Sequence, residues 1–138
     1  MTDYADVPQE IVERVRAVCL ALPDAYEEQA WVGTRWRVRK KTFAHLLAID
    51  SAWPVAYARA VPVTGPVTLI TFRAADDELA ALVNSGPPFY KPEWAPDIVG
   101  MIIDDGVDWG EVTELLTDSY CKLAPKKLAA QVHQPPAP

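Results

Sequence analysis

The spacing of apolar residues along this chain changes several times, and each spacing predicts a different element. Residues 8–22 carry apolar side chains at helical intervals, such as Ile11, Val15 and Cys19, which predicts a helix with one buried face. The pattern then shortens to the alternation that is typical of strands, over residues 26–32, 35–40 and 42–49. The first third of the chain is therefore predicted to be one helix followed by three strands.

The next strand has the clearest signal in the chain. Residues 67–73 are rich in β-branched side chains and follow the turn signal Gly65-Pro66. After it, the pattern predicts a helix over 76–84 and a strand over 98–104. The next helix is predicted to begin with the capping box of Asp108 and Glu111 and to end before Pro125. A short turn over 126–132 is predicted to follow it.

A long connection over residues 50–64 precedes that strand. It contains aromatic residues and prolines, Trp53, Pro54, Tyr57 and Pro62. A connection of this length without secondary structure is uncommon and can carry function. A pair of short irregular strands is the alternative interpretation.

The order of the predicted elements indicates the fold class. Strands that follow one another, rather than alternating with helices, favour an antiparallel sheet with helices packed on one face. We therefore expect an α+β two-layer sandwich with the order α-β-β-β-β-α-β-α. The 138 residues are expected to form a single domain over 1–133, followed by a proline-rich disordered tail over 134–138.

Positive charge is concentrated in one short segment. The chain has a net charge of −6, yet five cations follow one another closely: Arg35, Arg37, Arg39, Lys40 and Lys41. On a strand, the three alternating arginines would share one face and leave Trp36 for the core. Five contacts with nucleic-acid phosphates would give a log–log salt slope of about −4.5. The alternative is a solvated edge strand that carries charge against edge-to-edge pairing.

A second candidate surface is the proline-rich segment over residues 87–96. Its aromatic residues are Phe89, Tyr90 and Trp94. They can form an aromatic wall for a base, a small ligand or a partner protein. Alternatively, the segment closes over the end of the sheet and buries its aromatic side chains.

The chain carries no recognisable catalytic or metal-binding pattern. The nearby carboxylates Asp104, Asp105 and Asp108 lack the other ligands of a calcium loop, and turn and capping roles account for them. His45 lies among apolar residues without a partner cysteine or histidine in sequence. We therefore expect no metal, no cofactor and no enzymatic activity.

The sequence also indicates the cellular compartment. The N-terminus lacks the basic and apolar regions of a signal peptide, and no apolar run approaches the length of a membrane span. We expect a cytoplasmic protein with no membrane partner, in which Cys19 and Cys121 are buried free thiols.

Four sequence blocks together resemble one family. They are residues 19–23 (Cys-Leu-Ala-Leu-Pro), 37–44 (Arg-Val-Arg-Lys-Lys-Thr-Phe-Ala), 86–90 (Gly-Pro-Pro-Phe-Tyr) with Trp94, and 108–111 (Asp-Trp-Gly-Glu) leading to 116–120 and 124–128. On these blocks the chain resembles the MmcQ/YjbR family of small bacterial proteins over nearly its whole length. The resemblance implies a CyaY-like or secretion-chaperone-like α+β fold and DNA binding through a double-wing surface on the sheet.

Two hypotheses for function follow. The first is non-catalytic nucleic-acid binding, in which the five cations contact phosphates with little sequence specificity, because no base-reading helix is evident. The second is a protein–protein adaptor or a small-ligand module that uses Phe89, Tyr90 and Trp94.

Overall fold

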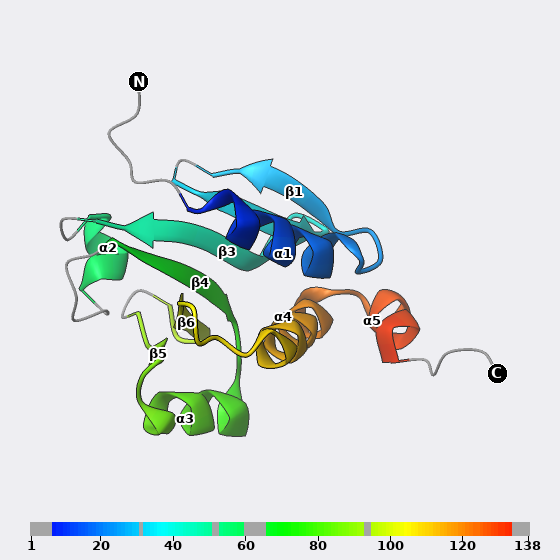
Figure 1. The fold of residues 1–138 in the computed structure, drawn as a ribbon. Helices are drawn as coiled ribbons and strands as arrows, with labels where there is room; N and C mark the ends of the chain where they lie inside the picture. The colour runs from blue at the N-terminus through cyan, green and yellow to red at the C-terminus, as the bar shows by residue number, and fades with distance from the viewer. Residues whose placement is uncertain (1–6, 31, 51–52, 60–65, 93–94, 134–138) are drawn as a thin grey trace.

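The computed structural model describes residues 7–30, 32–50, 53–59, 66–92 and 95–133. In chain order the elements are α1 (Gln9–Leu20), β1 (Tyr26–Gln29), β2 (Thr34–Val38), β3 (Lys41–Ile49), α2 (Val55–Ala58), β4 (Val67–Arg73), α3 (Asp76–Ser85), β5 (Phe89–Tyr90), β6 (Ile98–Ile103), α4 (Trp109–Leu123) and α5 (Lys126–His133). The described strands form one antiparallel sheet in the order β1-β2-β3-β4-β6-β5. The predicted α+β class and element order are confirmed (Figure 1).

The main core lies between the sheet and the helices α1 and α4. Alternate residues of the strands point to this side, which we call the α4 face, and they include Trp36, Leu46 and Ile70. The helices contribute Val15, Cys19, Leu116 and Tyr120, all of which are fully buried. The prediction that Trp36 belongs to the core is confirmed.

The opposite side of the sheet, which we call the α2 face, carries a second and smaller cluster. The fully buried side chains of Leu47 and Ile49 pack there with Leu69, and Tyr57 from α2 covers them. Part of the 50–64 connection is thus a short helix, so the expected pair of irregular strands is wrong for residues 55–58. Residues 51–52 and 60–65 lie outside the described part of the chain.

Several boundaries differ from the predictions, and one of them matters for the site. β4 covers the predicted residues, and Asp108 caps α4 by accepting hydrogen bonds from the N–H groups of Gly110 and Glu111. β2, in contrast, ends at Val38 and not at residue 40. The predicted tail, residues 134–138, is not among the described residues.

Within the described ranges, no helix combines the length and the apolar content that crossing a membrane requires.

Candidate anion site on the α2 face

The five cations of the predicted ridge occupy a hairpin formed by β2 and β3, which we call the basic hairpin. Arg35 and Arg37 point to the α2 face, as their alternation predicts, but both contact one carboxylate. Arg35 Nε donates to Glu28 Oε1 at 2.8 Å, and Arg37 Nη1 lies 3.3 Å from the same oxygen. The hydrogen bond from Arg35, with the charges of both guanidinium groups, lowers the pKa of Glu28. Two of the arginines that are predicted to contact phosphates are therefore already paired with a carboxylate of the protein itself.

The expectation that Arg39 projects from the strand with the other arginines is wrong. Arg39 and Lys40 form the two-residue turn between the paired residues Val38 and Lys41, with φ values of 50° and 68°. The turn directs Arg39 toward Asp24, at 3.3 Å between Nη2 and Oδ2. Lys40 and Lys41 are exposed and form no ion pair with any residue that the structure describes.

Beside the basic hairpin, the α2 face contains a cavity of about 250 Å³. We call it the α2-face cavity. The polar side chains among its lining residues are Arg35, Thr42, His45, Tyr57, Thr71 and Arg73. Two of these are cationic, and no carboxylate is among the described lining residues. A hollow with this lining favours an anion.

Strand register explains why these residues meet. Arg35 lies opposite His45, and His45 lies opposite Thr71, so the three form one row across β2, β3 and β4. Arg73 follows Thr71 by two residues and therefore points to the same face. Tyr57 reaches the row from α2, outside the sheet.

His45 forms a hydrogen-bonded wall of the cavity. Its Nε2 lies 2.7 Å from the carbonyl oxygen of Val32, and its Nδ1 lies 3.2 Å from the hydroxyl of Tyr57. Because a carbonyl oxygen only accepts, Nε2 carries the proton and Nδ1 accepts from Tyr57. Burial lowers the pKa of His45, and the charge of Arg35 lowers it further. The imidazole is thus held neutral in one tautomer.

Arg73 is the second cation of the cavity. Its Nη1 donates to Asp97 Oδ1 at 2.8 Å, and its side chain remains 29% exposed. That bond uses one of the five N–H groups of a guanidinium. Arg73 can therefore hold Asp97 and still donate to a bound anion.

The predicted aromatic wall over residues 87–96 is not assembled as expected. Phe89 is buried in the core of the α4 face, whereas Tyr90 packs with the cluster on the α2 face. Adjacent residues of a strand point to opposite sides, so the two rings do not share a surface. Trp94 lies outside the described residues.

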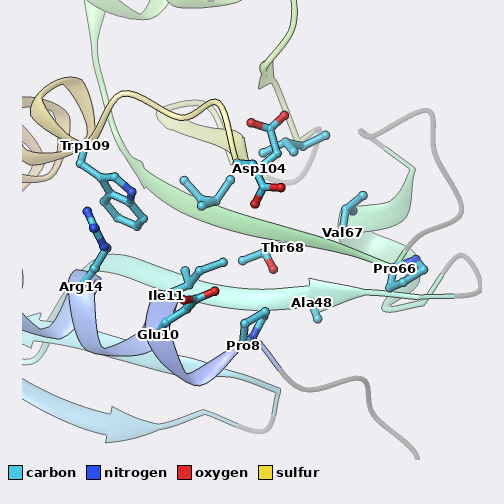
Figure 2. Close-up of a pocket in the computed structure, with 13 residues that line it drawn as sticks. Pro8, Glu10, Ile11, Arg14, Ala48, Pro66, Val67, Thr68, Asp104 and Trp109 are labelled. Atoms are coloured by element: carbon cyan, nitrogen blue, oxygen red, sulfur yellow. The ribbon is translucent and has the colours of Figure 1, made fainter.

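A larger hollow of about 530 Å³ lies on the α4 face, between α1 and the start of α4. Figure 2 shows Ala48 and Thr68 at its floor, Glu10 and Asp104 at its sides, and Arg14 beside Trp109. The guanidinium of Arg14 lies 5.2 Å from the centre of the Trp109 ring. This hollow has a carboxylate-rich rim, so its charge is unsuited to an anion.

The carboxylates Asp104 and Asp108 have the structural roles that the sequence indicates. Asp104 Oδ1 accepts from the N–H of Gly106, and Asp108 caps α4. Over the described ranges, no three residues of the types His, Cys, Asp and Glu gather closely enough to hold a metal ion.

Sequence reasoning missed four polar residues of the cavity: Thr42, Tyr57, Thr71 and Arg73. The sequence does contain a signal for Thr71, because it is a polar residue within an apolar central strand. It lies two residues before Arg73 and therefore points to the same face of the sheet. Tyr57 lies in the long connection, whose position over the sheet depends on tertiary packing. The sequence around His45 raises only the roles of metal ligand and catalytic base, whereas its place beside Arg35 follows from strand register.

Comparisons with known proteins place this geometry in context. The YjbR family model matches residues 20–122. A crystal structure of a protein from Pseudomonas syringae is similar over 82% of this chain and 95% of that chain, with a TM-score of 0.57 and 16% sequence identity, which shows a shared fold. No curated protein matches the chain.

Proposed function

The chain belongs to the YjbR family, and we propose that it is a non-catalytic binding protein for a small organic anion. The α2-face cavity carries this proposal, because it joins Arg35 and Arg73 to polar groups and has no carboxylate among its described lining residues. Arginine suits carboxylates and phosphates, since its planar N–H groups match their oxygens. The two free cysteines fit a cytoplasmic location.

The size and walls of the cavity restrict the ligand. Cavities that hold drug-sized molecules measure about 300–1,000 Å³, so 250 Å³ suits a smaller compound. Tyr57 and Ile98 provide apolar wall, and Thr42 and Thr71 provide hydroxyl groups. A carboxylate or phosphate monoester attached to a small apolar body matches this combination.

The state of His45 supports the proposal of binding without conversion. Both of its ring nitrogens already have hydrogen-bond partners within the protein. A general base needs a nitrogen within reach of the proton that it removes. His45 therefore shapes and hydrogen-bonds the site, and the proposal assigns it no proton transfer.

Nuclear magnetic resonance (NMR) titration of the isotope-labelled full chain tests this proposal. Benzoate and phenyl phosphate serve as probes, with benzyl alcohol as the neutral control. We expect the anions to bind with a Kd of about 1 mM or tighter and to shift the backbone signals of Arg35, His45, Thr71 and Arg73. Benzyl alcohol should leave these signals in place.

The substitution Arg73→Gln should weaken binding of both anions about tenfold or more, since a charged hydrogen bond contributes about 1.5–3 kcal/mol. Arg14→Gln makes the same change in net charge on the α4 face and should leave affinity nearly unchanged. Equal weakening by both variants, or no shifts at the cavity in the wild type, contradicts the proposal.

Nucleic-acid binding is a second candidate, favoured by Lys40 and Lys41 at the tip of the basic hairpin. These lysines are exposed and make no ion pair among the described residues, and Arg39 lies next to them. The other arginines of the hairpin already contact Glu28. Two or three phosphate contacts would give a salt slope of about −1.8 to −2.7.

Fluorescence anisotropy with a labelled DNA duplex tests this candidate. Affinity should fall about 10- to 40-fold between 50 and 200 mM salt, and the double variant Lys40→Ser, Lys41→Ser should lose most of the binding. The pair Lys126→Ser, Lys127→Ser is the matched control on α5. Absence of binding at 50 mM salt, or equal loss in both pairs, would exclude the basic hairpin as a nucleic-acid site.

A further inference from the structure

The pairing between β3 and β4 stops at the edge of the α2-face cavity. Ala44 and Phe72 form the last pair, and one more step would place Phe43 opposite Arg73. β3 instead continues beside β2, and β4 continues beside β6 as far as Arg73. β3 and β4 separate here, and the cavity is lined by residues 42–44 of β3 and residues 71–73 of β4.

A hydroxyl group from the helix layer occupies the point of separation. Ser119 of α4 is fully buried. Its Oγ donates to the carbonyl oxygen of Phe43 at 2.6 Å and accepts from the N–H of Arg73 at 2.8 Å. Ser119 thus bridges the two backbone groups that would face each other if the ladder continued.

We infer that Ser119 is a positioning residue for the α2-face cavity, and this inference rests on the proposed function. Its hydroxyl holds β3 and β4 apart and fixes the backbone of Arg73, whose side chain is one of the two cations of the site. Buried backbone groups are nearly always paired. Without the hydroxyl, Phe43 and Arg73 either lose their partner or approach each other, and in both cases the wall of the cavity moves.

The experiment compares Ser119→Ala with the wild type by two NMR measurements. Hydrogen exchange of the Arg73 amide should become at least about tenfold faster. The affinity for phenyl phosphate should fall by about the same factor, because the Arg73 guanidinium is displaced. Ser85→Ala is the control, because Ser85 also donates to a backbone carbonyl, that of Ala81, but on the exposed side of α3. It should change neither quantity.

A second variant separates hydrogen bonding from volume and also serves if Ser119→Ala does not fold. Ser119→Cys nearly keeps the side-chain volume and forms weaker hydrogen bonds. It should bind phenyl phosphate more weakly than the wild type. Wild-type affinity in this variant would overturn the inference, because volume alone would then position the wall.

The remaining outcomes are also decisive. Unchanged Arg73 exchange in Ser119→Ala overturns the positioning role, whether or not the probe binds. If the Arg73 amide exchanges faster in Ser119→Ala but the wild type binds no probe, Ser119 has a role in folding only. That outcome overturns both its link to a ligand and the proposed function. Faster exchange with weaker binding supports both.

Discussion

Two adjacent glutamates on β1 illustrate how strand geometry separates the roles of neighbouring residues. Glu27 points to the α4 face, where it accepts from Arg16 and from the indole N–H of Trp36 at 2.9 Å. Glu28 points to the α2 face, where it holds Arg35 and Arg37. One side chain therefore stabilises the core, and the other limits the charge that the basic hairpin presents.

Replacing Glu27 by Ala should destabilise the fold. Trp36 is fully buried, and the substitution leaves its N–H without its acceptor, which costs about 1–3 kcal/mol. Urea denaturation measures the loss. Glu27→Gln keeps an oxygen that can accept from the indole, so its effect should be smaller. An equal loss of stability in both variants would show that the ion pair between Glu27 and Arg16, and not the hydrogen bond to Trp36, carries the effect.

The protonation state of His45 should make stability depend on pH. Its pKa is lowered in the folded state by burial, from an ordinary value of 6.5. The unfolded chain therefore binds a proton first as the pH falls, so the free energy of unfolding should decrease below pH 6.5 and stop decreasing below the folded pKa. Denaturation between pH 8 and pH 5 measures this slope, and His45→Gln should remove it. The same slope in the variant would point to another group.

At the level of elements, the turn of the basic hairpin shows where sequence patterns stop being informative. Alternation correctly separates Trp36 from Arg35 and Arg37, because a strand has a period of two. The end of the strand has no such signal: a two-residue turn with positive φ usually contains Asn or Gly, and this one contains Arg39 and Lys40. For this reason the prediction that Arg39 continues the row of Arg35 and Arg37 is wrong.

That turn also predicts a stabilising substitution. Lys40 has a φ of 68°, a conformation that costs a residue with a side chain about 1–2 kcal/mol relative to glycine. Lys40→Gly should raise the free energy of unfolding by about 1 kcal/mol, as measured by urea denaturation. Lys41→Gly, one residue further and inside β3, should lower it, because glycine weakens a strand. Destabilisation by Lys40→Gly would show that the lysine side chain makes a stabilising contact.

The cavity could be predicted only in part, for reasons that differ among its residues. Register places Arg35, His45 and Thr71 in a row, and the alternation in their strands is visible in the sequence. The opening between β3 and β4 depends on Ser119, which follows Phe43 by 76 residues. No local pattern indicates a contact between residues so far apart in sequence, so the sequence indicates which face each residue of a strand takes, but neither the row nor the hollow beside it.

At the scale of the whole molecule, the two hollows described above differ in the sign of the charged side chains that line them. The hollow on the α4 face has Glu10, Asp104 and Asp105 among its lining residues, and the α2-face cavity has Arg35 and Arg73. The net charge is −6, so an anion is repelled on average and attracted only where cations are locally in excess. Local pairing, rather than total charge, should therefore control anion affinity.

Two substitutions with the same effect on net charge test this expectation. Glu28→Gln weakens the hold on Arg35 and Arg37 and should increase the affinity for phenyl phosphate several-fold. Glu10→Gln, on the α4 face, should change it little, because a distant exposed charge is screened at about 0.15 M salt. NMR titration of both variants provides the comparison. Equal gains would mean that total charge controls binding.

The short helix α2 has a practical consequence. It forms one wall of the cavity through Tyr57, while β3 and β4 on either side of it remain joined by continuous pairing from Ala44 with Phe72 to Ile49 with Val67. Residues 55–58 therefore lie over two strands that are already paired beneath them. A library that varies these residues alone would change which compounds the protein selects while the pairing of β3 with β4 stays in place.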